Sequence, residues 1–460
     1  MELTQSFQDL VCGFQSVFTT PTFGTFLQLV TGWIMSPQRH RFVTELIQSA
    51  GATGQGHHSR FHRFFSHASW SLDLLFRLLA LKLVQTLVPE GTIEISLDDT
   101  LCRKRGLKLH GAGMHYDPLI SSRIKSLVSW GHDWVIVCLV FKNPFWSSTK
   151  DWSLPIGCRL YRNRQGVTKG KQQKGAKSNT KQKAKADPHH RTRPEWAVEL
   201  LEMIAGWFPN REFLVTGDSA YGGKSVLSKL PANMHLISRV HPKGRLYAPP
   251  PPPVKGQNGR PRLKGELLSN REAWSQDPQS PWKRLTFDQF GLHAQLEVKV
   301  RQALYYAAGR NRLLTIVLTR DLVGERPEQM FYCTNLTLSA KQILGAYASR
   351  WSIEVTFENS KQLLGLEDPA NRLPLAVERT APMALFLYSL SVLWFHQEGH
   401  RHVQFPYRPW YRKKSEPSFA DILATLRRQT WKNLLQGVPQ QPHPTNIVFA
   451  QLADFLCRPA

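Results

Sequence analysis

Acidic residues are scarce in this sequence of 460 residues. It holds 34 Asp and Glu against 59 Lys and Arg, which gives a formal net charge of +25. A net positive charge of that size favours a polyanionic partner, because Lys and Arg that neutralise phosphates release the counterions condensed on the nucleic acid. The charge therefore predicts nucleic-acid binding, and the alternative is a protein that is merely basic.

Cysteine is also rare, and none of the six cysteines belongs to a CxxC pair. This spacing argues against a zinc ribbon and against a disulfide scaffold, and it favours a reducing compartment. The first residues, MELTQSFQDL, contain no basic segment followed by an apolar run, so we expect no signal peptide. A cytoplasmic protein that associates with nucleic acid is the expectation.

Long hydrophobic runs are missing as well. The most apolar stretch, residues 381–395, is shorter than the roughly 20 residues that span a bilayer, and it contains Pro382. We expect a buried helix there and no membrane partner. Hydrophobic residues still make up 42% of the chain, which is enough to build cores and argues against wholesale disorder.

Residues 1–90 show helical periodicity, with apolar positions recurring at steps of three and four. The glycine-rich break GATGQG separates two short helical segments, which is the outline of a helix-turn-helix. The second segment carries Arg60 and Arg63. The pattern predicts a DNA-binding helical region, while an ordinary amphipathic helix with a solvated basic face is an equal alternative.

Strand patterns appear from residue 91. Residues 91–241 alternate strand and helix, as expected for a first core segment. Within it, residues 162–193 contain eleven Lys or Arg and one acid, with almost no apolar residues. We expect a basic loop whose Lys171, Lys174 and Lys177 bind DNA phosphates.

Later segments change character again. Residues 242–338 break this pattern. They contain five consecutive prolines, Pro249 to Pro253, which indicate a loop or the edge of an inserted module, and strand-like runs resume from Leu296 to Asp321. Residues 339–400 return to helical periodicity as the last part of the core, and residues 401–460 form a C-terminal region. The fold class is therefore a multidomain α/β protein.

Three acidic positions stand out. Asp98 and Asp99 end one predicted strand, Asp218 ends another, and Glu354 lies in a helical segment. Carboxylates at the carboxyl ends of parallel strands meet at one rim of a sheet. Three of them can hold two divalent ions about 4 Å apart for phosphodiester chemistry, and Mg²⁺ prefers such oxygen ligands, with Mn²⁺ as a substitute. Each Asp taken alone is more often a turn or cap residue.

The glutamate belongs to a wider pattern, Y-x2-R-x3-E-x6-K, formed by Tyr347, Arg350, Glu354 and Lys361. On one helix these steps place all four side chains on the same face. Arg350 can grip a phosphate with two hydrogen bonds, whereas Lys361 offers a point charge. A salt-bridged, solvated helix face is the alternative.

With these residues in view, the segment AYASRWSIEVTFENSKQ resembles the signature of bacterial insertion-sequence transposases of the DDE superfamily that carry the YREK motif. ISLDDT and FLVTGDSAYGG resemble the first and second acidic motifs of that family. The resemblance covers about residues 91–365 and implies a ribonuclease-H-like core with a β-rich insertion. It implies that Asp99, Asp218 and Glu354 are the catalytic metal ligands, with Asp98 and Glu358 as rivals.

The resemblance further implies that Tyr347, Arg350 and Lys361 bind transposon-end phosphates. Family members cut the terminal inverted repeats of double-stranded DNA, often through a hairpin, and join them to target DNA as a synaptic homodimer with magnesium. In relatives an aromatic side chain stacks on a flipped base, for which Trp274 and Trp282 are candidates, although core packing is an alternative. A non-catalytic DNA-binding protein and a structure-specific nuclease are the rival functions.

Overall fold

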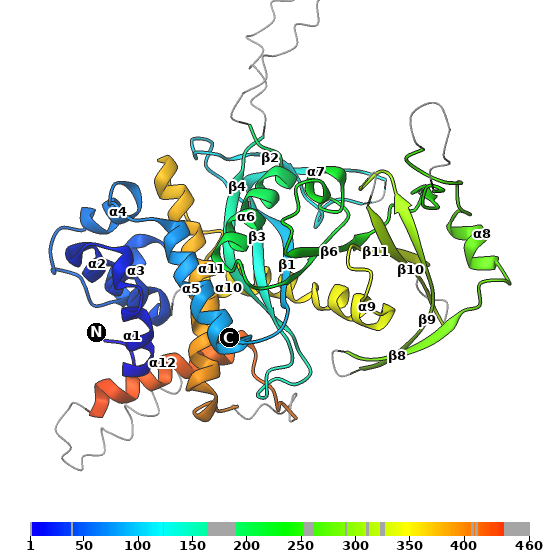
Figure 1. Ribbon diagram of the computed structural model, residues 1–460. Helices are drawn as coiled ribbons and strands as arrows, with labels where there is room; N and C mark the ends of the chain where they lie inside the picture. Colours follow the sequence, from blue (N-terminus) through cyan, green and yellow to red (C-terminus); the bar gives the residue numbers. More distant parts are fainter. Residues whose placement is uncertain are drawn as a thin grey trace, which may run out of the picture.

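The computed structural model shows the N-terminal and C-terminal helices gathered at one end of a large twisted sheet, whereas other helices lie along the sheet (Figure 1). The description covers residues 2–37, 40–122, 124–163, 190–252, 262–289, 292–309, 312–322, 327–405, 409 and 413–436. Lys171, Lys174 and Lys177 of the predicted basic loop lie outside these residues. Among the described residues, no helix is long and apolar enough to cross a membrane.

One buried helix, α11 (Pro374–Gln397), organises the helical side of the molecule. Its residues 379–395 are buried without interruption, as expected for a helix that is apolar on all faces. This confirms the buried helix predicted for residues 381–395. The helices around it are α1 (Gln5–Cys12), α2 (Thr20–Met35), α3 (Val43–Ser49), α4 (Ser59–Ser66), α5 (Leu72–Leu87) and α12 (Phe419–Gln436), with short 3₁₀ turns at Gln15–Val17 and Gly399–Arg401.

The predicted helix-turn-helix outline corresponds to α3 and α4. Residues 50–58 separate these helices, and Gly51, Gly54 and Gly56 adopt positive φ angles of 64°, 84° and 102°, a region that favours glycine. Arg63 is exposed. Arg60 donates a hydrogen bond to the Gln28 side chain. Binding of DNA by these two arginines stays a prediction.

The core of the sheet has five strands in the order β4-β3-β1-β5-β6. β3 pairs antiparallel with both β1 and β4, whereas β1, β5 and β6 are parallel. This is the strand order expected of a ribonuclease-H-like core, and with the helical flanks it confirms the predicted fold class. The bounds are β1 (Ile93–Arg103), β3 (Val128–Phe141), β4 (Trp152–Tyr161), β5 (Phe213–Gly217) and β6 (Met234–Arg239).

The strands of residues 242–338 extend this same sheet. β11 pairs antiparallel with β6, and β10, β9 and β8 follow in order. The strand-like runs expected from Leu296 to Asp321 correspond to β9 and β10. The bounds are β7 (Leu246–Tyr247), α8 (Arg271–Gln276), β8 (Lys283–Gln289), β9 (Leu292–Tyr305), β10 (Leu313–Asp321) and β11 (Gln329–Cys333).

Four helices and one short strand complete the description. α6 (Arg193–Trp207) begins with a capping box between Thr192 and Glu195, which satisfies free N–H groups of its first turn. The others are β2 (Gly113–Tyr116), α7 (Lys224–Leu227), α9 (Ala340–Ser349) and α10 (Ser352–Leu364). α10 packs on β1 and β4, which brings Glu354 to the sheet.

Candidate active site

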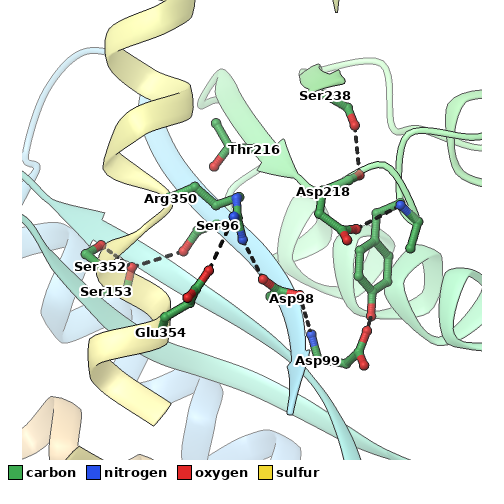
Figure 2. Close-up of polar contacts among 12 residues, drawn as sticks. Ser96, Asp98, Asp99, Ser153, Thr216, Asp218, Ser238, Arg350, Ser352 and Glu354 are labelled. Atoms are coloured by element: carbon green, nitrogen blue, oxygen red, sulfur yellow. Dashed lines mark hydrogen bonds and ion pairs between the residues drawn. The ribbon is translucent and has the colours of Figure 1, made fainter. Parts of the chain in front are cut away.

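Neighbouring carboxylates on β1 point to opposite faces of the sheet, because side chains alternate along a strand. Asp98 faces the start of α10, and its Oδ2 accepts a hydrogen bond at 2.5 Å from Nη1 of Arg350, which precedes that helix. Asp99 faces the other way, and its Oδ1 accepts a hydrogen bond from the hydroxyl of buried Tyr221 at 2.6 Å. Figure 2 shows these two directions.

Asp218 follows β5 directly. The parallel register aligns Leu97 with Gly217, so Asp218 comes next to Asp98 at the same rim of the sheet. Its Oδ1 accepts the N–H of Ala220 at 2.8 Å, and its carbonyl accepts the hydroxyl of Ser238 at 2.8 Å (Figure 2). These contacts fix the turn that carries the carboxylate.

The space around Gly222, in the turn after Asp218, explains why glycine occupies this position. A Cβ atom at this position would lie 2.3 Å from Oγ of Ser238, which is the group that holds the Asp218 carbonyl. The carbonyl of Gly222 accepts a hydrogen bond from the Tyr332 hydroxyl at 2.7 Å. A side chain at residue 222 would therefore force Ser238 to shift, and with it the hydrogen bond that Ser238 donates to Asp218.

Arg350 links the first and third acidic positions. While Nη1 contacts Asp98, Nη2 lies 3.5 Å from Oε1 of Glu354. The arginine is largely buried, whereas Glu354 is more exposed. The structure therefore gathers Asp98, Arg350 and Glu354 from two distant segments, beside Asp218.

The prediction of one continuous helix for the YREK residues is wrong. α9 ends at Ser349 and α10 begins at Ser352, so Tyr347 and Glu354 lie on different helices. The cause is local: the Ser349 carbonyl accepts the Ser352 hydroxyl at 2.8 Å, and the N–H of Ile353 bonds instead to the Arg350 carbonyl at 3.0 Å. The tighter turn still leaves Arg350 and Glu354 together.

Tyr347 and Lys361 occupy different surroundings. Tyr347 is buried, and its ring lies 5.4 Å from the guanidinium of Arg239 and 5.6 Å from that of Arg350. Nζ of Lys361 donates to the carbonyl of Leu101 at 2.7 Å, farther along β1. The structure thus brings Tyr347 to Arg350, while Lys361 contacts β1 beyond Asp98 and lies 3.3 Å from Oε1 of Glu367.

Burial and charge perturb the first carboxylate. Burial raises the pKa of Asp98 to about 7, and repulsion from Asp218 and Asp99 adds to this effect although Arg350 opposes it. A divalent cation would relieve that repulsion, and carboxylate oxygens are the donors that Mg²⁺ prefers. The donor chemistry therefore fits such an ion.

The described residues do not already form a complete set of metal ligands at this site. Within the described ranges, no three His, Cys, Asp or Glu side chains are grouped as a metal site. Arg350 lies between Asp98 and Glu354 and contacts both. The arginine therefore supplies the positive charge that these two carboxylates face.

A second polar cluster lies on the reverse face of β1. Arg193, the first residue of α6, donates from Nε to Oδ2 of buried Asp133 at 2.5 Å and lies 3.4 Å from Asp99. Burial and the nearby Asp133 raise the pKa of Asp99 to about 6. Sequence reasoning missed Asp133 and Arg193, because a buried strand and the end of a basic loop gave no separate signal.

The remaining candidates lie elsewhere. Trp274 is buried with Arg301 stacked 3.8 Å from its ring centre, which suits the core-packing alternative. Trp282 is half-buried, with the Arg320 guanidinium at 4.3 Å from its ring centre.

Glu358, the rival third acid, accepts a hydrogen bond from Gln362 at 3.1 Å. Arg239, which sequence reasoning missed, ends the strand next to β5 and contacts Tyr347.

The carboxylates on a ribonuclease-H-like sheet define a nuclease- or transposase-type class. Residues 13–306 match the family model described as DDE superfamily endonuclease, so the chain belongs to that family. No curated protein matches the chain. DDE endonuclease domains generally use divalent metal ions. The matched residues include Asp98, Asp99 and Asp218 and end before Glu354.

Proposed function

We propose that this chain is a DNA transposase of an insertion sequence, which cuts the ends of its element and joins them to target DNA. Asp98, Asp218 and Glu354 are the proposed catalytic metal ligands for two Mg²⁺ ions, with Mn²⁺ as a substitute. The observation that carries the proposal is the contact of Arg350 with both Asp98 and Glu354, beside Asp218.

The proposal places Asp98, in preference to Asp99, in the first catalytic position. Asp98 shares its face of β1 with Arg350 and Glu354. Asp99 is held by Tyr221 and Arg193 on the reverse face. The sequence motif favoured Asp99 because it directly precedes Thr100, but strand alternation gives the two carboxylates different partners.

The chemistry assigned to these residues is phosphodiester cleavage and transfer. Bound divalent ions supply activation of the attacking oxygen and stabilisation of the leaving oxygen. Asp98 and Asp218 contribute fixed carboxylates, and the more exposed Glu354 contributes one that is freer to reorient. Arg350 orients the scissile phosphate, because its guanidinium can hold two oxygens of one phosphate group.

The proposed partners are double-stranded terminal inverted repeats and target DNA, held by a homodimer in the synaptic complex. The net charge of +25 supports a polyanionic partner. Arg60 and Arg63 on α4, with Lys171, Lys174 and Lys177, are proposed phosphate contacts. Tyr347 and Lys361 are proposed to contact the DNA strand near the site.

The test uses duplexes made from the DNA that flanks the gene, incubated with the full chain and magnesium. Paired inverted repeats should be cut, and the cut ends should appear covalently joined to a supercoiled target. Cutting without joining would replace the proposal with a structure-specific nuclease. Specific binding without cutting would replace it with a non-catalytic DNA-binding protein.

A further inference from the structure

The connection between β1 and β3, residues 104–127, exposes large apolar side chains at the surface. Leu107, Leu119 and Ile124 are 82%, 80% and 99% exposed. Met114, Tyr116 and Ile120 in the same connection are also exposed. Large apolar side chains that a folded domain leaves exposed within one segment commonly mark an interaction site.

Hydrogen bonds to Asp117 hold the outer turn of this connection in place. Asp117 is buried, and its carboxylate accepts hydrogen bonds from Arg103 at 2.6 and 3.0 Å, from Ser129 Oγ at 2.6 Å and from the N–H of Leu119 at 3.1 Å. These bonds lower the pKa of Asp117 to about 2, with the Arg103 hydrogen bond as the largest cause. The apolar side chains are thus presented by a fixed turn, as in binding loops held on a rigid scaffold.

The charged residues of this connection indicate what kind of partner it binds. The connection contains five Lys or Arg and a single acid, Asp117, which is buried. Arg105, Lys108 and Lys125 are exposed among the apolar side chains. Cations interleaved with exposed apolar groups complement the phosphates and the base steps of DNA, where apolar side chains can insert and unstack bases.

The connection follows the end of β1 beyond the proposed site, so a duplex bound at that site and lying along β1 would reach it. Arg350 contacts β1 at Asp98, and Lys361 contacts it at Leu101, so α10 runs along β1 toward this connection. Lys104 donates to the carbonyls of Glu367 and Pro369, just beyond α10. From Asp98 to Arg103 the strand rises about 17 Å, which corresponds to roughly five base pairs of DNA.

We propose that the described residues of this connection, 104–122 and 124–127, form a DNA-deforming surface, in which Leu119 and Ile124 insert at a base step roughly half a helical turn or more from the scissile phosphate. Arg105, Lys108 and Lys125 hold the flanking phosphates. This inference rests on the proposed function and adds to it a surface that bends or unstacks the duplex near the site.

The test compares the full chain with the double variant Leu119→Ser/Ile124→Ser. Phe145→Ser is the matched control, because Phe145 is also exposed but lies in the turn at the opposite end of β3. The probe is a duplex of about 30 base pairs with 2-aminopurine in place of adenines, whose fluorescence rises when a base unstacks. The wild type and the control should raise the fluorescence, and the double variant should not.

The double variant should also bind the duplex about tenfold more weakly. Equal fluorescence for all three proteins would overturn the inference while leaving the proposed function intact, provided that the wild type still cuts repeat DNA. A change in the oligomeric state of the double variant without DNA, seen by sedimentation, would show instead that the surface covers a second copy of the chain. Failure of the wild type to bind or cut any repeat duplex would overturn the proposed function itself.

Discussion

The Arg350 guanidinium donates a hydrogen bond to Asp98 Oδ2 over 2.5 Å and lies 3.5 Å from Glu354 Oε1. The two carboxylates proposed to bind metal therefore share one cation from their own chain. A divalent ion and this guanidinium are attracted to the same oxygens. Metal binding would consequently free Arg350 to hold a DNA phosphate.

Arg350→Lys should separate charge from geometry. Lysine keeps the positive charge but cannot hold two phosphate oxygens at once. We expect first-strand nicking to survive better than hairpin formation or joining, with the later steps slowed on the order of a hundredfold. A time course on labelled ends that resolves nicked, hairpinned and joined products measures this.

The competing role for Arg350 is purely structural pairing with Asp98 and Glu354. That role predicts equal slowing of every step, or none, because lysine retains an ion pair with the carboxylates. Either pattern would argue against phosphate positioning by Arg350.

Asp98→Asn should change how stability depends on pH. Burial raises the pKa of Asp98 from 3.8 to about 7, so the folded state binds this proton more tightly than the unfolded state. The resulting stabilisation is present below about pH 4 and is lost as the pH rises to about 7. The asparagine variant has no such proton, so its melting temperature should fall less over this window. Metal-free melting curves from pH 4 to 8 test this, and parallel curves for the two proteins would contradict it.

His132 should give stability the opposite dependence on pH. Burial lowers its pKa from 6.5 to about 4, and its Nε2 donates to the His110 carbonyl at 2.9 Å. The stabilisation is therefore present above pH 6.5 and is lost as the pH falls toward 4. His132→Gln keeps a donor but cannot gain a charge, so it should be less sensitive to acid over this range. Urea unfolding at pH 7 and pH 4.5 compares the two proteins, and an equal loss of stability in both would contradict the expectation.

Sequence patterns predicted much of the fold because they report burial directly. The apolar run at residues 381–395 predicted a buried helix, the alternating pattern of TIEISLDD located β1, and the strand-like run REFLVTGD located β5. The proposed choice of Asp98 over Asp99 rests on which face of β1 meets α10, which the motif does not report. The break between α9 and α10 depends on hydroxyl bonds of Ser352, which helical periodicity does not report. Arg193 and Asp133 come together only through the docking of α6.

The predicted basic loop should strengthen DNA binding without specifying sequence. Lys171, Lys174 and Lys177 suit phosphates and not base edges, because a lysine offers a point charge without a base-specific hydrogen-bond pattern. Replacing all three with Gln should lower the slope of log affinity against log salt by up to about 3, equally for repeat and random DNA. Filter binding across salt concentrations measures the slope. Loss of discrimination with an unchanged slope would refute this role.

The central claim is that Asp98, Asp218 and Glu354 form the catalytic site. The most direct measurement is a cleavage gel beside a mobility shift in magnesium for Asp98→Ala, Asp99→Ala, Asp218→Ala and Glu354→Ala. We expect the Asp98, Asp218 and Glu354 variants to bind repeat DNA nearly as well as the wild type and to lose cleavage by about a thousandfold or more. Asp99→Ala should retain measurable cleavage, because its carboxylate faces Tyr221 and Arg193. Near wild-type cleavage by Asp98→Ala, with none by Asp99→Ala, would contradict the assignment.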